Sequence, residues 1–261
     1  MNELISGWKF NPNKITISDL PIELTNLPLE FNDYRIVQIS DFHLGSWLDE
    51  QDLGQIIDIV NQLKPDLIAI TGDFVNSNPG RYSPVLLQTL SKLFAKDAIV
   101  AVLGNHDHYS EPDIIRDVLR ESNIIELNNR VYPIQRSSSY LYFAGVDDHL
   151  TKKDDLQNVL NQIPDESTAI LLAHEPDYAD ISSMSGTFDI QLSGHSHGGQ
   201  ICLPYFGSLY LPRYGRKYSS GIYRINGMVL YTNRGLGTSW LPFRYNCPPE
   251  IAIFTLSAPI N

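Results

Sequence analysis

Two histidines separated by one serine, in the run GHSHGG at residues 194–199, raise the first chemical question. Imidazole nitrogens bind divalent transition metals or move protons near neutral pH. Alternate residues of an extended segment point to the same side, so His195 and His197 can reach two neighbouring ions while Ser196 faces away. Five of the chain's seven histidines follow short apolar runs in this way: His43, His106, His174, His195 and His197.

Two carboxylates and an amide occupy equivalent places behind other apolar runs. Asp41, Asp73 and Asn105 come after YRIVQIS, LIAIT and AIVAVL. A lone aspartate in such a place is usually a helix cap or a turn residue, and a lone histidine is usually a satisfied surface or core residue. The same coincidence of residue type and placement occurs at five strand ends, so we interpret these residues as one site.

The donor types define which metals the site suits. Carboxylate, imidazole and amide donors without a thiolate suit Mn²⁺, Fe, Zn²⁺, Co²⁺ or Ni²⁺, and exclude iron–sulfur clusters and soft copper. Seven donors are too many for one ion with an open position, whereas two ions about 3.5–4 Å apart that share one carboxylate would use them all. The candidate ligands are Asp41, His43, Asp73, Asn105, His174, His195 and His197.

Strands and helices alternate over the first 122 residues, which predicts a parallel sheet built from βαβ units. The ranges 34–40, 67–71 and 98–103 are predicted strands, and the predicted helices cover 52–63, 84–96 and 111–122. Ligand sites of such sheets gather at the carboxyl ends of the strands. The elements therefore place the candidate ligands at one edge.

Strands dominate the remaining sequence. They are predicted at 140–146, 168–173, 188–193, 220–225, 228–233 and 250–256. The segment 15–24 is predicted to form an edge strand that Pro21 interrupts. Asn226-Gly227 indicates a tight hairpin. An α/β half followed by a strand-rich half predicts two packed sheets with helices outside.

Length and composition indicate one ordinary globular domain over residues 1–261, with 1–30 as an N-terminal edge segment. The sequence has no apolar run long enough for a transmembrane helix. Residues 1–14 lack the pattern of a signal peptide, although a chain trimmed of its leader would look the same. We therefore expect a cytoplasmic protein, with peripheral contact to a membrane as a further option.

Charge is distributed unevenly along the chain. The net charge of −11 disfavours a nucleic-acid binder. Residues 201–245 nevertheless hold six basic side chains, seven of the fourteen tyrosines and no acidic residue. This segment is either a loop that packs its apolar residues on the sheet, or a rim that attracts an anionic substrate, including one at a lipid surface. Within it, Arg234 is the predicted ligand of substrate phosphate.

Five motifs resemble, in order, those of the calcineurin-like metallophosphoesterase superfamily. They are DFH at 41–43, GD at 72–73, GNHD at 104–107, AHEP at 173–176 and GHSH at 194–197. The resemblance implies a four-layer α/β/β/α sandwich with two packed mixed sheets, outer helices and a dinuclear metal centre.

The resemblance also implies a role for each site residue. One ion is expected on Asp41, His43 and His197, the other on Asn105, His174 and His195, and Asp73 is expected to bridge them. His106 matches the family's non-ligand histidine, which contacts the phosphoryl group and assists the leaving group. Asn105 is expected to contact substrate as well, and Asp107 to orient His106 through its ring nitrogen.

The C-terminal runs GHSHGGQICLP, NRGLGTSWLPFR and NCPPEI look like a bacterial branch of this superfamily. That branch includes enzymes resembling UDP-2,3-diacylglucosamine pyrophosphatases. We expect a phosphodiesterase or pyrophosphatase that hydrolyses a small or lipid-linked substrate by attack of a hydroxide bridging two Mn²⁺ ions. A phosphomonoesterase, a nuclease and a non-catalytic scaffold of the same fold remain alternatives.

Overall fold

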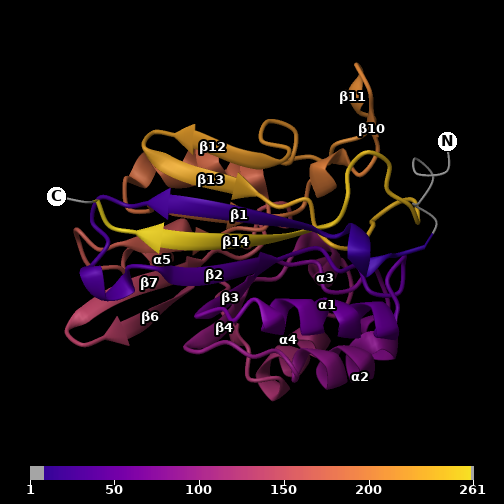
Figure 1. The fold of residues 1–261 in the computed structure, drawn as a ribbon, viewed down its shortest axis with the longest axis horizontal. Coiled ribbons are helices and arrows are strands. Elements are labelled where there is room, and N and C mark those ends of the chain that lie inside the picture. The colour runs from indigo at the N-terminus through magenta and orange to yellow at the C-terminus, as the bar shows by residue number, and fades with distance from the viewer. Residues whose placement is uncertain (1–8, 260–261) are drawn as a thin grey trace.

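The computed structural model of the protein describes residues 9–259, and Figure 1 shows its ribbon. Two six-stranded sheets form its centre, with strand orders β1-β14-β2-β3-β4-β5 and β12-β13-β9-β8-β7-β6. The strands of the first sheet are β1 (Thr16–Glu23), β2 (Tyr34–Ile39), β3 (Leu67–Ile70), β4 (Ala98–Ala101), β5 (Ile125–Glu126) and β14 (Glu250–Ser257). Those of the second are β6 (Arg130–Arg136), β7 (Ser139–Gly145), β8 (Ala169–Leu172), β9 (Ile190–Ser193), β12 (Gly221–Ile225) and β13 (Met228–Thr232).

Helices and a small separate hairpin complete the fold. The helices are α1 (Glu50–Gln62), α2 (Pro79–Leu90), α3 (Asn105–Tyr109), α4 (Pro112–Glu121), α5 (Leu156–Leu160) and α6 (Ala179–Ser182). Short 3-10 turns cover Pro12–Lys14, Leu29–Phe31, Pro176–Tyr178, Ser183–Ser185 and His197–Gly199. The strands β10 (Cys202–Leu203) and β11 (Gly207–Ser208) pair antiparallel with each other alone.

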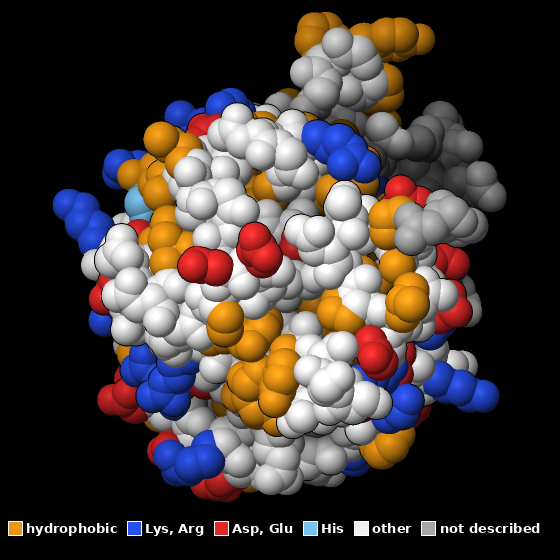
Figure 2. All heavy atoms as spheres, turned by 90° about the vertical axis from the view of Figure 1, so that its left-hand side faces the viewer, with side chains coloured by type: hydrophobic (Ala, Val, Ile, Leu, Met, Phe, Trp, Pro, Cys, Tyr) orange, Lys and Arg blue, Asp and Glu red, His pale blue; other side chains and the backbone are white. Residues whose placement is uncertain are grey.

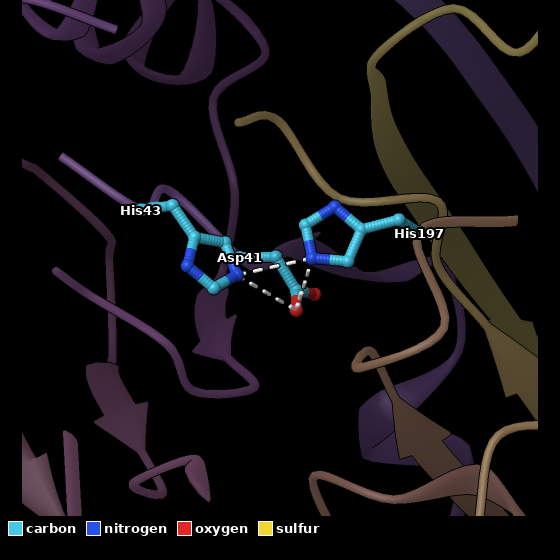
Figure 3. Close-up of side chains that lie close together, drawn as sticks. All are labelled: Asp41, His43 and His197. Atoms are coloured by element: carbon cyan, nitrogen blue, oxygen red, sulfur yellow. Dashed lines mark hydrogen bonds and ion pairs between the residues drawn. The ribbon is translucent and has the colours of Figure 1, made fainter. Parts of the chain in front are cut away.

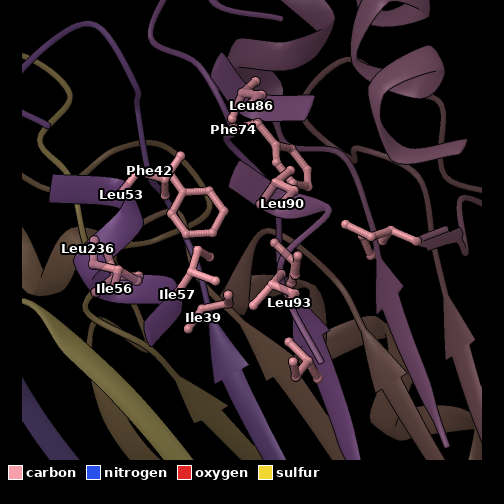
Figure 4. Packing of buried hydrophobic residues seen from close by; sticks show 14 of the residues in the cluster. Ile39, Phe42, Leu53, Ile56, Ile57, Phe74, Leu86, Leu90, Leu93 and Leu236 are labelled. Atoms are coloured by element: carbon pink, nitrogen blue, oxygen red, sulfur yellow. The ribbon is translucent and has the colours of Figure 1, made fainter. Parts of the chain in front are cut away.

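Three apolar clusters define four layers. The first joins α1, α2 and α4 to the outer face of the first sheet, and Figure 4 shows Leu53, Ile57 and Leu90 packing there with Ile39. The second lies between the sheets, where Phe254 and Phe143 are fully buried. The third covers the far face of the second sheet with α5 and α6. Burial of apolar surface on both faces holds the sheets together, and the predicted α/β/β/α sandwich is confirmed.

Both sheets are mixed. In the first, β2, β3, β4 and β5 run parallel, while β14 is antiparallel to β2 and parallel to the edge strand β1. In the second, β7, β8, β9 and β13 run parallel between the antiparallel outer strands β6 and β12. Asn226 and Gly227, with φ of 49° and 90°, make the predicted turn between β12 and β13.

The second helix begins and ends earlier than the predicted range 84–96. It covers Pro79–Leu90, because a proline is pre-set for the first helical position. Pro84 then lies inside the helix without an N–H to donate. The hydroxyl of Ser83 donates to the carbonyl of Gly80 instead, at 3.4 Å, so this carbonyl keeps a partner.

The N-terminal segment predicted at 1–30 contributes β1 to the edge of the first sheet. Its first eight residues lie outside the described part of the chain. Among residues 9–259, no helix combines the length and the hydropathy needed to cross a lipid bilayer.

Candidate metal centre

The carboxyl ends of parallel strands from both sheets converge on one place. Asp41 and His43 follow β2, Asp73 follows β3, and His174 follows β8. Hydrogen bonds connect these loops directly: Asp41 N–H donates to Gly72 O (2.9 Å) and His43 N–H to Asp73 O (3.1 Å). The two sheets are joined here as well, because Gln38 Nε2 of β2 donates to Ser193 O of β9 (3.0 Å).

The predicted ligands form two groups around Asp73. Asp41, His43 and His197 bring one donor atom each to within 4.8 Å of one another, and so do Asp73, His174 and His195. Figure 3 shows the first group, with Nε2 of His43 3.0 Å from Nε2 of His197. The Asp73 Oδ2 atom lies 3.3 Å from Nε2 of both His43 and His174. One carboxylate oxygen therefore stands between the two groups.

Buried donor atoms without hydrogen bonds show that the site fits cations. Oδ1 of Asn105 and Nε2 of His174 are buried and have no hydrogen-bond partner. An unpaired buried polar atom is costly, so most such atoms in native proteins are satisfied. Oδ1 and Nε2 are typical ligand atoms for divalent transition metals. Cations between the two groups would satisfy the atoms of Asn105 and His174.

The backbone at five of the seven candidate ligands is in the left-handed region. Non-glycine residues pay about 1–2 kcal/mol each for this conformation. Such strain persists where the surrounding structure fixes it, and it concentrates at functional sites. The five residues, with φ between 45° and 66°, are Asp41, His43, Asp73, His195 and His197.

The electrostatics favour the metal-binding forms of Asp73, His195 and His197. By contrast, burial raises the pKa of Asp41, and the charge of Asp73 raises the pKa of His174 despite its burial. Burial, and next the charge of His174, lower the pKa of His195 to about 4. Burial and the charge of His43 also hold the pKa of His197 well below its usual value. Burial alone would raise the pKa of Asp73, but the charges of His174 and His106 outweigh it and lower that pKa well below normal. Neutral imidazoles and an ionised carboxylate are the forms that coordinate metal.

Backbone carbonyls fix the orientation of two rings. Nδ1 of His174 is 2.6 Å from Thr71 O, and Nε2 of His195 is 2.8 Å from Arg213 O. A ring nitrogen that donates to a carbonyl leaves the other nitrogen free as a ligand. His174 thus presents Nε2 to the site, and His195 presents Nδ1.

Arg244 is a site residue that the sequence reasoning did not find. Its side chain is buried, with Nη2 3.2 Å from Nδ1 of His197. The same guanidinium donates to Gly237 O at 2.6 Å and to Arg234 O at 2.8 Å. Arg244 therefore ties the loop after β13 to the ring of His197. Nothing in the sequence separates it from the other basic residues of 201–245.

His106 stands at the edge of the site, with a different partner from the one expected. Its Nδ1 is 3.1 Å from Asn76 O, and its backbone N–H donates to Asp73 Oδ1 at 2.9 Å. The carboxylate of Asp107 instead accepts backbone N–H groups of Asp73, Phe74 and Gly104 at 2.9–3.0 Å. The prediction that Asp107 orients the His106 ring is therefore wrong. Asp107 fixes the loops that carry Asp73 and His106.

Arg234 does not face the site. Its Nε and Nη2 atoms lie 3.2 Å and 3.1 Å from the two carboxylate oxygens of the buried Glu250. A guanidinium held by both oxygens of a carboxylate has its preferred geometry already satisfied. This pairing contradicts the prediction that Arg234 binds substrate phosphate. Arg234 has a structural role instead.

A cavity of about 440 Å³ opens over the two groups of ligands. Asp73, Asn105, His106, His195 and His197 form its polar side. Its remaining lining combines aromatic, apolar and uncharged polar residues with one arginine: Tyr109, Leu150, Ser196, Gly199, Gln200, Tyr210, Pro212, Arg213, Ser239 and Trp240.

Residues 34–199 match the family described as calcineurin-like phosphoesterase. The chain belongs to this family. The match covers every predicted ligand and His106, so the enzyme is a metal-dependent phosphoester hydrolase that uses divalent metal ions.

Curated relatives agree with this assignment. The chain is 35% identical to the uncharacterized metallophosphoesterase YkuE of Bacillus subtilis, over 95% of this chain and 87% of the relative. It is 26% identical to the phosphodiesterase YaeI of Escherichia coli, over 85% and 82% of the two chains. It spans only 57% to 63% of the length of several other curated relatives.

Solved structures show the same fold. The sulfate thiohydrolase SoxB of Thermus thermophilus superimposes with a TM-score of 0.52 and 12% identity, over 88% of this chain and 57% of SoxB. At this identity the likeness concerns the fold alone.

Proposed function

We propose that the enzyme is a dinuclear phosphodiesterase that acts on a small or lipid-linked phosphodiester or pyrophosphate, with Mn²⁺ as its metal. The position of Asp73 Oδ2, 3.3 Å from Nε2 of both His43 and His174, is the observation that carries the proposal. One oxygen in that position can serve two cations, which is the arrangement of two-metal hydrolases.

Two cations bound by these donors would supply a water of lowered pKa and positive charge for the phosphoryl oxygens. His106 lies beside them and lines the cavity, with Nδ1 held by Asn76 O. In its protonated form, Nε2–H of His106 donates to the phosphoryl group or gives its proton to the departing oxygen. Asn105, at the start of α3, lines the same cavity, and its buried Oδ1 has no hydrogen-bond partner.

The cavity supports a diester as substrate more than a monoester. A diester carries one negative charge and two organic groups, whereas a monoester near neutral pH carries up to two charges and one group. Arg213 is the one arginine or lysine among the residues that line this cavity, and the apolar residues of the lining include Leu150, Pro212 and Trp240. YaeI, one of the relatives, is named a phosphodiesterase.

Turnover of two model substrates tests the choice. We expect the Mn²⁺-loaded enzyme to hydrolyse bis-nitrophenyl phosphate with a kcat/KM at least about tenfold above that for nitrophenyl phosphate, a difference of about 1.4 kcal/mol in the barrier. Initial rates at matched metal concentration measure this ratio. A preference for the monoester would replace the diesterase proposal with the phosphomonoesterase alternative.

A further inference from the structure

A small hairpin carries the most exposed apolar side chains of the described residues. It consists of β10, β11 and their connecting turn, and it projects from the body of the molecule in Figure 1. Tyr205 and Phe206 at its tip are 103% and 87% exposed. In Figure 2 the hairpin stands above the rest of the surface, and hydrophobic side chains lie at its end.

The exposed side chains continue from this tip to the mouth of the cavity. We call Tyr205, Phe206, Leu209, Tyr210 and Trp240 the aromatic rim; the last three are 56%, 53% and 45% exposed. The rings of Tyr210 and Trp240 pack edge to face with centroids 6.0 Å apart, and both residues line the cavity. The rim therefore leads from a projecting tip directly to the site.

The chemistry of the rim suits a membrane–water interface. Tyrosine and tryptophan place an apolar ring and a polar tip at such a boundary. A narrow hairpin with two exposed aromatic rings at its tip can insert into a lipid bilayer, because a fluid bilayer needs no complementary pocket. It does not offer the broad, flat surface of a standard protein–protein interface.

Positive charge lies beside the rim. Arg213 and Arg216 form no ion pair with any described carboxylate, whereas Lys217 is paired with Asp180 at 2.7 Å. Each basic residue near an anionic bilayer contributes about 1 kcal/mol of attraction. All 30 acidic residues of the chain lie outside 201–245, so the segment itself carries a net positive charge that an anionic surface attracts. The carboxylates of Asp177 and Asp180 contact this segment, at the backbone N–H of Arg216 and at the ammonium group of Lys217.

We infer that the aromatic rim inserts Tyr205 and Phe206 into the surface of an anionic lipid bilayer. Arg213 and Arg216 then meet the lipid phosphates, and the mouth of the cavity lies at the level of the headgroups. The contact itself does not depend on the reaction. Its consequence, that the substrate is a phosphodiester presented by the membrane, rests on the function proposed above.

Vesicle binding by the full chain tests the contact. The probes are vesicles of phosphatidylcholine alone and vesicles of equal parts phosphatidylcholine and phosphatidylglycerol, separated by sedimentation. We expect binding to the anionic vesicles that weakens as salt screens the charges. The double variant Tyr205→Ser/Phe206→Ser is expected to bind the anionic vesicles at least about tenfold more weakly. It lacks the two aromatic rings whose transfer from water into the bilayer favours binding. Phe94→Ser, which removes a 69% exposed ring elsewhere, is the matched control and should bind like the wild type.

The outcomes separate the contact from the reaction. Tyr205 and Phe206 do not line the cavity, so hydrolysis of soluble bis-nitrophenyl phosphate should be equal in the wild type and the double variant. Absence of wild-type binding, or equal binding by the double variant, overturns the inference. The inference is also overturned if sedimentation velocity shows that the wild type is a dimer and the double variant a monomer, since the rim then forms an interface between two copies of the chain. Vesicle binding without hydrolysis of any phosphodiester overturns the proposed function alone.

Discussion

Replacement of Asp73 by asparagine is expected to lower the rate of phosphodiester hydrolysis by more than about 100-fold, since even residues that only support metal ligands contribute 10- to 100-fold. Oδ2 of Asp73 is 3.3 Å from the ring nitrogens of both His43 and His174. The asparagine can keep its oxygen on the His106 N–H, which Oδ1 of Asp73 accepts at 2.9 Å. Its uncharged NH₂ group then replaces the shared oxygen, and metal content should fall with the rate.

Asp66→Asn is the matched control for this substitution. Asp66 precedes β3, whereas Asp73 follows it, so the two carboxylates lie at opposite ends of one strand. Asp66 is paired with Arg136 at 2.8 Å, away from the cavity. The metal content and the initial rate of Asp66→Asn should equal those of the wild type. An Asp73→Asn variant with full metal content and full rate would contradict the shared-ligand assignment.

His106→Ala is expected to retain both metals and to slow the hydrolysis of a diester with a poor leaving group by about 100- to 10,000-fold. The backbone bond from residue 106 to Asp73 survives the change, so the ligand loops should hold. A diester with an activated leaving group needs less help from a proton donor, and its rate should fall less. The comparison of the two kcat values measures the contribution of the ring to leaving-group departure.

His149→Gln provides the comparison variant for His106. Nδ1 of His149 is 3.0 Å from Asp154, and the residue does not line the cavity. Its rates on both diesters should equal those of the wild type. If His106→Ala loses the same factor on both leaving groups, His106 positions the phosphoryl group and does not supply a proton.

The sequence predicted the elements and the residues that converge, because both depend on local patterns. Buried parallel strands are short apolar runs, and polar side chains directly behind them stand out. Asp41, Asp73 and His174 were found in this way, and the structure places them together. The order of the five motifs then supported the family, which the match over 34–199 shows.

The orientation of the side chains could not be predicted in this way. The rings of His106 and His174 are oriented by the carbonyls of Asn76 and Thr71, which every residue type possesses. The separate roles of Arg234 and Arg244 depend on which buried group each guanidinium meets across the fold. Residue type gives no information on that choice.

Anomalous diffraction from crystals soaked in Mn²⁺ tests the pairing of metals most directly. Two peaks are expected about 3.5–4 Å apart, on either side of the Asp73 carboxylate. The imidazole nitrogens of His43 and His197 should coordinate one peak, and those of His174 and His195 the other. A single peak, or two that share no oxygen of Asp73, would contradict the dinuclear site.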